Sequence, residues 1–568
     1  MRRFAFLISC CLVTGIWADA AGTGSAATGF KNDGTGYFDD CTPPTTWDEG
    51  TKKNLVWKRP MPSWTASSPV VINDKHVVTL AEPNLVVCLS IQNGDVLWKT
   101  EIDNLVALNE KQRAAAKALY DKWNRRYTET LAIAAELKVL QDRLLCIGDK
   151  PEKAFSGNFM LNQIQPALKK GARAEFEKLS KDEIAAIEAR ISELKEKTVR
   201  GMATPSTGII WPKGEDRKEW DAARAELAKY GYQFETWYGH MGHTFATPVT
   251  DGKRIYVSMG WGQVAALSIA GDVLWLKTRE LKPNPELRFT NSPILVDGKL
   301  VVIAGGAIRA FDSKDGKILW SHQCPRPRVS MGQDQSGSPM ELTLGGKAYV
   351  VTSHGRIYRA ADGVIMTEKL PHLVASPVVA GDLIVIARGG VHGTTGKVKA
   401  EALRARLDEA GEKITLMPIW QAPLGGRAGM WTGPALHDGI LYYGYPQNVL
   451  SLDLMTGKLV KNYVPNKFGY GSSHATNPSV AGGYYFTGNC YGQTLAVKAG
   501  PDGEAVALNQ LHSELYRDHA LEPVEILRRK WWNRGLFPTW GFSQSTPAFA
   551  GNRIFIRTYE ALYCIGAE

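Results

Sequence analysis

The chain has 568 residues, 44% of them apolar and 22% charged, and a formal net charge of +10. After Ala20 no apolar run is long enough for a membrane-spanning helix, which excludes a helical membrane protein. The length alone would allow several domains, but 56 glycines, 29 prolines and 17 tryptophans are typical of a turn-rich β protein. The charge weakly favours anionic envelope polymers or lipid headgroups as partners, and solubility alone is the preferred explanation.

Residues 1–20 have the features of a secretory signal peptide. A pair of arginines precedes an apolar run from Phe4 to Trp17, and Ala18-Asp19-Ala20 is a small-x-small cleavage site. We therefore expect an exported protein, periplasmic or extracellular, that is soluble after removal of this segment. Leu7-Ile8-Ser9-Cys10 offers the alternative of a lipoprotein box, but a cut there would leave only a few apolar residues before it.

Two segments of different composition follow. Residues 21–53, called the leader below, are rich in Gly, Thr, Asp and Pro and have no strand pattern. We expect the leader to form an irregular strap across one face of the fold. Residues 54–103 comprise a strand from Asn54 to Lys58 and then a unit with a strand pattern, which opens with Ser68-Pro69 and ends at Trp98.

Residues 104–239 form an insertion in which the apolar period changes from two to three and four. One apolar stripe runs from Ala116 to Leu144, and a capping box, Ser180 to Glu183, precedes a second from Ile184 to Leu194. A third, short helix is predicted over Glu215–Tyr230. The first two helices predict a hairpin, which either folds onto the edge of the β domain or projects as a coiled coil that binds a partner.

Residues 240–568 consist of repeats, best seen from Asn291 to Trp320. There, four short apolar runs are separated by Asp297-Gly298, Gly305-Gly306 and Lys314-Asp315-Gly316, which predicts a four-stranded antiparallel meander. Copies recur about every 45 residues, and several end in Gly-x-x-Leu-Trp. Each copy opens with a small or polar residue before proline: Ser68-Pro69, Thr247-Pro248, Ser292-Pro293, Ser338-Pro339, Ser376-Pro377, Gly433-Pro434, Asn477-Pro478 and Thr546-Pro547. Eight units predict an eight-bladed β-propeller, which protects sheet edges by radial repetition.

The two ends of the chain predict how the ring closes. The last unit stops at its third strand, Ala561–Ile565, and the strand at Asn54–Lys58 is available as the fourth. The predicted fold class is therefore an all-β, eight-bladed propeller closed by its N- and C-terminal strands, monomeric, with an inserted α-helical hairpin. The domain boundaries are 1–20, 21–53, 54–103, 104–239 and 240–568, the last containing blades 2–8.

Two smaller insertions are Val391–Pro418, which carries a charged segment from Lys397 to Lys413, and Asn509–Thr539. The second contains Arg528–Arg534, in which basic residues flank paired tryptophans. Such a pattern can stack on bases or sugars, but a loop packed by its own aromatic residues is the preferred interpretation, and no nucleic acid is expected.

Six cysteines remain after export, and no short spacing pairs them. Cys88 and Cys564 lie on the third strands of neighbouring blades, and for them a disulfide and buried free thiols both stay open.

The repeats carry a resemblance to a known family. Their Gly-x-x-Leu-Trp endings, their Ser-Pro openings and the aspartates of Phe311-Asp312 and Leu452-Asp453 resemble the tryptophan-docking repeats of quinoprotein alcohol dehydrogenase-like propellers. The opening from Phe30 to Trp47, with Asn54 to Val71, is more similar to the PQQ-like repeat proteins of the BamB type, which serve outer-membrane assembly. This resemblance covers about residues 30–568 apart from the insertion, and it implies the fold without deciding between dehydrogenase and non-catalytic scaffold.

The polar segments before each proline are the candidate site, because the innermost strands of a propeller line its channel and these segments meet at one mouth. The channel-mouth binding candidates are His240, His243, Arg288, Asn291, Gln333, Gln335, Arg427, Trp431, His474, Asn477 and Gln544. Imidazoles are ligands for zinc or copper, but no cysteine or carboxylate accompanies these histidines at a fixed spacing. Hydrogen-bonded channel histidines are therefore preferred, and no metal site is predicted.

The resemblance also implies a catalytic alternative. Asp334 would be the general base of a PQQ- and calcium-dependent alcohol or sugar dehydrogenase, with Asn291, Asn477, Trp431, Arg288 and Arg427 available to hold calcium and the quinone. Many larger enzymes of that family carry a disulfide between adjacent cysteines, and no Cys-Cys pair remains here after export. A water-filled polar channel is preferred to a quinone site.

Three functions are weighed on these grounds. The preferred one is an exported, non-catalytic propeller that binds an envelope protein or an anionic polymer, through the helical insertion and the channel mouth. The alternative is the PQQ-dependent dehydrogenase with Asp334 as its base. A third possibility is carbohydrate binding by aromatic residues of the channel.

Overall fold

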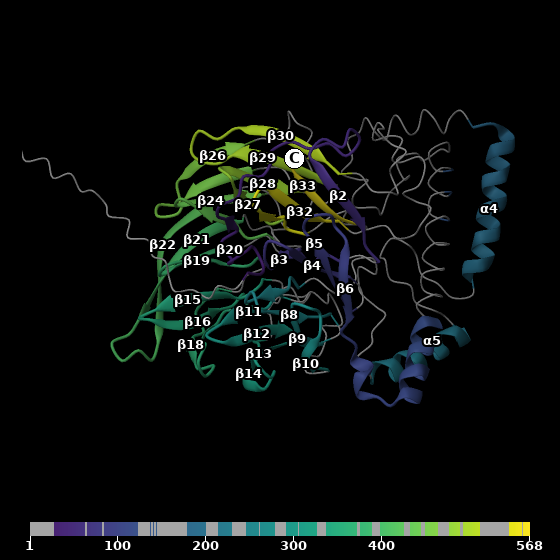
Figure 1. The fold of residues 1–568 in the computed structure, drawn as a ribbon, viewed down its shortest axis with the longest axis horizontal. Coiled ribbons are helices and arrows are strands. Elements are labelled where there is room, and N and C mark those ends of the chain that lie inside the picture. The colour runs from purple at the N-terminus through teal and green to yellow at the C-terminus, as the bar shows by residue number, and fades with distance from the viewer. Residues whose placement is uncertain are drawn as a thin grey trace, which may run out of the picture.

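The chain folds into eight antiparallel sheets arranged around a ring, with helices to one side of them (Figure 1). The computed structural model describes residues 28–62, 65–81, 84–122, 137, 140, 144, 179–199, 214–229, 246–260, 262–278, 291–304, 306–325, 337–371, 375–388, 398–424, 432–444, 449–463, 476–488, 492–511, 545–558 and 561–567. The predicted eight-bladed propeller is confirmed. In blades 1–6 the first strand along the chain is the innermost, and in blade 8 the innermost strand is β31. Inner strands of neighbouring blades are in contact, as between β7 and β11 or β11 and β15.

Blades 1–4 follow the predicted four-strand order. Their strands are β3 (Val70–Val71), β4 (His76–Ala81), β5 (Leu85–Ser90) and β6 (Val96–Glu101) in blade 1; β7 (Val249–Thr250), β8 (Arg254–Ser258), β9 (Val264–Ser268) and β10 (Val273–Lys277) in blade 2; β11 (Ile294–Val296), β12 (Lys299–Ala304), β13 (Ala307–Asp312) and β14 (Ile318–Gln323) in blade 3; and β15 (Met340–Leu344), β16 (Lys347–Val351), β17 (Ile357–Arg359) and β18 (Ile365–Thr367) in blade 4.

Blades 5–8 complete the ring. Their strands are β19 (Val378–Ala380), β20 (Leu383–Arg388), β21 (Lys399–Leu407) and β22 (Ile414–Pro423) in blade 5; β23 (Ala435–His437), β24 (Ile440–Gly444), β25 (Val449–Asp453) and β26 (Leu459–Tyr463) in blade 6; β27 (Ser479–Ala481), β28 (Tyr484–Gly488), β29 (Gln493–Lys498) and β30 (Ala505–Gln510) in blade 7; and β31 (Ala548–Ala550), β32 (Arg553–Arg557), β33 (Ala561–Gly566) and β2 (Leu55–Pro60) in blade 8. Blade 8 thus joins both ends of the chain, because β2 pairs antiparallel with β33.

The turns explain why the sequence forms these hairpins. In blade 3, Asp297 and Gly298 have φ of 49° and 69°, as a type I′ turn requires, and this turn sets the register of Leu295 opposite Leu300. The two middle strands of a blade are buried on both faces because neighbouring blades cover them, so β12 and β13 read as almost unbroken apolar runs. The sequence therefore predicts the hairpins through their turns, because apolar and polar residues do not alternate along these strands.

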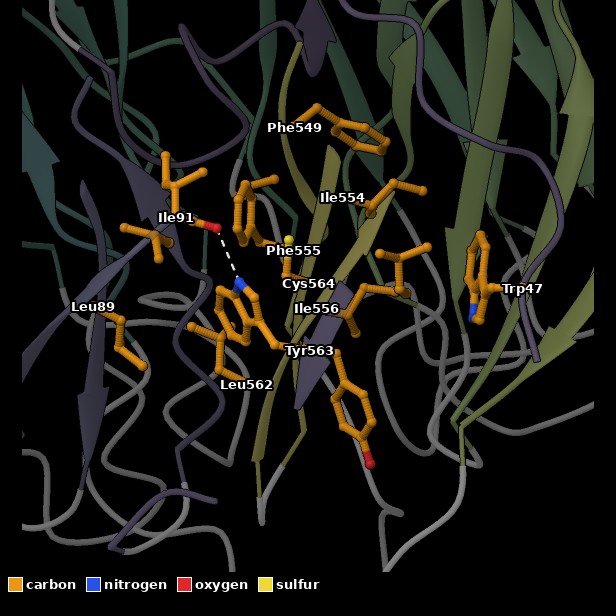
Figure 2. Packing of buried hydrophobic residues seen from close by; sticks show 14 of the residues in the cluster. Trp47, Leu89, Ile91, Phe549, Ile554, Phe555, Ile556, Leu562, Tyr563 and Cys564 are labelled. Carbon is orange, nitrogen blue, oxygen red and sulfur yellow. Dashed lines mark hydrogen bonds between the residues drawn. The ribbon is translucent and has the colours of Figure 1, made fainter. Parts of the chain in front are cut away.

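In five of the eight blades a tryptophan of the last strand joins the blade to the next one. The Trp275 indole of β10 lies against Gly316 of blade 3 and donates to the carbonyl oxygen of Ser313 at 3.1 Å. Trp57, Trp98, Trp320 and Trp420 make the corresponding hydrogen bonds at 2.8–3.0 Å, and the dashed line in Figure 2 marks the one to Ile91. A register shift between Val273 and Trp275 leaves Leu274 47% exposed. The bulge thus turns the tryptophan toward the neighbouring blade.

Other elements cover the joints where a last strand carries no tryptophan. The last strand of blade 4 has Met366 instead, and the hairpin of β21 and β22 in blade 5, the longest in the ring, packs Leu403 and Ile414 against that blade. These two strands take up part of the insertion that the sequence places at Val391–Pro418. Between blades 7 and 8 the leader supplies Trp47, whose backbone N–H donates to the Asn509 side-chain oxygen at 2.8 Å.

Much of the helical insertion lies outside the described residues. Helix α4 (Lys181–Val199) has the predicted capping box, because the Ser180 N–H donates to the Glu183 carboxylate at 2.7 Å and the Glu183 N–H donates to the Ser180 hydroxyl at 3.3 Å. Helix α5 (Gly214–Ala228) packs Ala223 and Leu227 against the helical residues that follow Asn109 and against the short 3₁₀ helix η1 (Asn104–Ala107). Figure 1 places α5 and α4 to one side of the sheets. No helix within the described ranges is long and apolar enough to cross a membrane.

Candidate functional site in the propeller channel

A belt of hydrogen bonds between blades surrounds the channel. In blade 3, the Ser292 N–H donates to the Ser338 hydroxyl of blade 4 at 3.0 Å, and the Ser338 N–H donates to Ser376 of blade 5 at 2.8 Å. The same contact recurs from Thr247 to Ser292, from Gly433 to the Asn477 side-chain oxygen, from Thr546 to Ser68 and from Ser68 to Thr247. Each acceptor is the residue before the proline that opens a repeat. The small polar residue of this motif is therefore selected by the contact to the preceding blade.

Blade 6 departs from this pattern. Gly433 stands where the other blades have Ser, Thr or Asn, so it offers no side chain to blade 5. A Cβ at this position would lie 2.6 Å from the Ser376 carbonyl oxygen and 3.7 Å from the Lys31 amine. The glycine thus admits the close approach of the Ser376 carbonyl of blade 5, and the Lys31 amine lies beside this glycine, donating to the carbonyl oxygen of Pro434. We call this place the Gly433 notch.

Lys31 belongs to the leader, which enters the channel. The leader exchanges backbone hydrogen bonds between Thr28 and Thr250 of blade 2, at 2.9 and 2.8 Å. Further along, β1 (Tyr37–Phe38) pairs in parallel with β27 and becomes a fifth strand on the inner edge of blade 7. The leader therefore runs across the ring instead of along its outer wall.

The channel retains a cavity of about 180 Å³ on the side of blades 1 and 8. It is lined by leader residues Thr28, Gly29, Lys31, Asn32 and Phe38 and by residues 68–71 and 546–549 of the innermost strands and their approaches. Its lining contains hydroxyl groups and apolar side chains, and no carboxylate. Space of this size suits water or a small molecule, because pockets for larger ligands span about 300–1,000 Å³.

Burial shifts the pKa values of three side chains. Lys31 is 2% exposed, and its burial lowers the pKa of the amine to about 7, against the opposing charge of Asp33. Burial likewise lowers the pKa of Arg557 in β32 to about 9, and its guanidinium donates to the Thr558 carbonyl oxygen. In blade 4, burial raises the pKa of Tyr358 to about 12, and its hydroxyl lies 2.9 Å from Nε2 of His354.

Two of the predicted mouth residues belong to the described part of the chain. Asn291 is 1% exposed, and neither atom of its carboxamide has a hydrogen-bond partner among the described residues. Asn477 uses its side-chain oxygen in the belt. The other candidates lie outside the described residues: Asp334, His240, His243, Arg288, Gln333, Gln335, Arg427, Trp431, His474 and Gln544.

The sequence reasoning missed the residues that contact one another in the channel. Ser292 and Ser338 were visible as repeat openings, but their role in joining blades was not. Lys31 had no signal at all, because a single lysine in a polar segment reads as a solvated side chain. Its amine lies beside Gly433, which is 402 positions along the chain from it (433 − 31).

Of the residues named above for calcium and the quinone, Asn291 and Asn477 belong to the described part of the chain. No group of three or more His, Cys, Asp or Glu side chains suited to a metal ion occurs within the described ranges. Among the described residues, the Asn291 carboxamide has an oxygen without a hydrogen-bond partner. Calcium takes six to eight oxygen ligands, several of them from carboxylates. Described cysteines Cys41, Cys88, Cys324 and Cys564 are free thiols, which resolves the open question for Cys88 and Cys564.

Comparisons with known proteins agree with this architecture. Eight blades, docked tryptophans and the belt define a β-propeller of tryptophan-docking repeats. Residues 235–401 match the family model described as outer membrane protein assembly factor BamB. Over these residues the chain is similar to the PQQ-like, BamB-type repeat proteins that its sequence motifs resemble. No curated protein matches the sequence.

Solved structures also resemble the chain, at low identity. BamB from Moraxella catarrhalis is 14% identical over 56% of this chain and 82% of its own, with a TM-score of 0.37. The computationally designed protein Ika8 is 12% identical over 56% of this chain and 93% of its own, with a TM-score of 0.32. The C-terminal WD40 domain of Sif2 is 8% identical over 56% of this chain and 79% of its own, with a TM-score of 0.36. Likenesses at these values carry no argument about function.

Proposed function

We propose that the protein is an exported, non-catalytic propeller that binds a partner in the cell envelope. Residues 235–401 match a family model described as an outer membrane protein assembly factor, and this match supports an envelope-associated binding or scaffold role. The N-terminal segment with the features of a signal peptide supports export. The formal charge of +10 suits an acidic partner surface or an anionic polymer.

The observation that carries the proposal is the helical insertion beside the ring. In α4 the apolar residues Ile187, Ile191 and Leu194 are buried, whereas charged residues such as Glu188 and Lys195 are exposed. The apolar stripe is thus used in packing, and a rigid charged face is presented to solvent. Charged faces of this kind set the specificity and the association rate of protein contacts more than their affinity.

The test compares capture of envelope proteins by the purified full chain and by charge-swapped variants. Glu188→Lys with Lys195→Glu reverses two exposed charges on α4, and Lys314→Glu with Asp315→Lys makes the same exchange on the exposed β13–β14 turn. We expect a specific partner, identified by mass spectrometry after crosslinking, to be lost from the α4 variant and kept by the turn variant. Loss from both variants, or from neither, would contradict docking through this helix.

A second measurement tests the non-catalytic part of the proposal. Purified protein is incubated with calcium and PQQ, and dye-linked dehydrogenase activity is measured across primary alcohols and aldoses together with the absorbance spectrum. We expect neither bound quinone nor activity. Quinone absorbance with activity that disappears in Asp334→Asn would make the channel a redox site and would overturn the proposal.

A further inference from the structure

The leader closes one end of the channel through contacts with several blades. Besides its bonds to blade 2, the Thr35 carbonyl accepts the Leu436 N–H of blade 6 and the Gly36 carbonyl accepts the Val480 N–H of blade 7, both at 2.8 Å. The Thr42 N–H donates to the Gly551 carbonyl of blade 8 at 2.8 Å. Gly36 approaches the Pro478 carbonyl so closely that a Cβ there would lie 3.1 Å from it. These contacts come from the innermost strands and the turns that follow them, so the leader lies at the channel end where those strands finish.

The deepest contact of the leader is the Lys31 side chain. It crosses the channel and ends at the Gly433 notch, where its amine donates to the Pro434 carbonyl. Among the described residues no carboxylate forms an ion pair with this amine. Nearby, the Tyr37 ring stacks on the His437 ring with centroids 4.0 Å apart. The leader is thus held against blade 6 by the buried amine, the ring contact and the backbone bond from Leu436 to Thr35.

We propose that the leader is a reversible plug of the channel and that the Lys31 amine, seated in the Gly433 notch, is its latch. Burying an ammonium group without an anionic partner costs free energy, whereas burying a neutral amine with one hydrogen bond costs much less. Closing the plug therefore releases a proton from Lys31. Whether the leader covers or opens one end of the channel thus depends on pH, while the rest of the ring stays folded.

The direction of the pH dependence follows from proton linkage. Released to solvent, Lys31 titrates at its ordinary pKa of 10.5, and in the seated form its pKa is about 7. The open form binds more protons between these values, so the closed form gains stability as pH rises from about 7 to 10.5 and gains nothing below 7. The charged or titratable groups that face the latch are Asp33 on the leader and His437 and Asp438 on blade 6, which lie 3.3 Å apart.

Hydrogen exchange of the full chain measures this opening directly. The reporters are the Thr42, Leu436 and Val480 amides, which are bonded between leader and ring. After correction for the intrinsic exchange rate, we expect their protection to rise up to tenfold per pH unit from pH 7.5 to 9.5, because one proton is released. In Lys31→Met the protection should lose this slope, and in the matched control Lys299→Met it should keep it.

A second set of amides separates the latch from the stability of the fold. In Lys31→Met the belt amides of Ser292 and Ser338, whose hydrogen bonds do not involve the leader, should keep their wild-type protection. A wild-type slope of zero across this pH range, or the same slope in Lys31→Met, would overturn the latch.

Discussion

The docked tryptophans allow a sharp prediction, because blade 3 contains a glycine pair that differs in one respect. Gly316 and Gly298 have nearly the same φ, 73° and 69°. A Cβ on Gly316 would lie 2.6 Å from Cε3 of Trp275, whereas a Cβ on Gly298 would meet nothing within 4 Å. Both substitutions by alanine carry the backbone cost of the left-handed region, about 1–2 kcal/mol. Gly316→Ala alone adds the clash with the indole.

The added cost follows from the packing. The indole is held by its own hydrogen bond and cannot retreat freely, and overpacking a filled site costs about 1–3 kcal/mol. We therefore expect Gly298→Ala to lower the free energy of unfolding by about 1–2 kcal/mol and Gly316→Ala to lower it by about 2–5 kcal/mol. Urea denaturation followed by circular dichroism measures both, with the slope of the transition checked for equality between variants.

A double-mutant cycle identifies the cause. In a Trp275→Ala background the neighbouring indole is gone, so Gly316→Ala should cost no more than Gly298→Ala does in the wild type. Equal destabilisation by the two glycine variants in the wild type would refute the reasoning. The same conclusion would follow if the larger cost of Gly316→Ala survived removal of the indole.

Two further predictions concern the belt and the buried thiols. Ser338→Ala leaves the buried Ser292 N–H without its acceptor and should lower the free energy of unfolding by about 1–3 kcal/mol; Ser321→Ala, at an exposed position of β14, should change it by less than about 0.5 kcal/mol, and similar effects of both would contradict the belt. Burial raises the pKa of both Cys88 and Cys564 to about 12. These two thiols should react with iodoacetamide at pH 8 only after unfolding in urea. Labelling of Cys88 or Cys564 in the native protein, located by mass spectrometry of its peptides, would contradict their burial.

The sequence by itself determined the blade count and the strand order. Asp297-Gly298 is a turn that only residues tolerant of positive φ can form, and the helix cap at Ser180 is equally local. The sequence motifs of the repeats also indicated the family whose model matches residues 235–401. These features depend on neighbours within a few positions along the chain, where residue type and spacing are sufficient evidence.

Only the tertiary structure decided what the repeated residues do. Ser292 and Ser338 lie 46 positions apart, yet one accepts a hydrogen bond from the other because the ring brings successive repeats into contact. Lys31 is buried because the fold brings its amine beside Gly433 and onto the Pro434 carbonyl of blade 6. Trp47 reaches Asn509 across 462 positions. Such contacts depend on the closure of the whole ring, and no local pattern of the sequence encodes them.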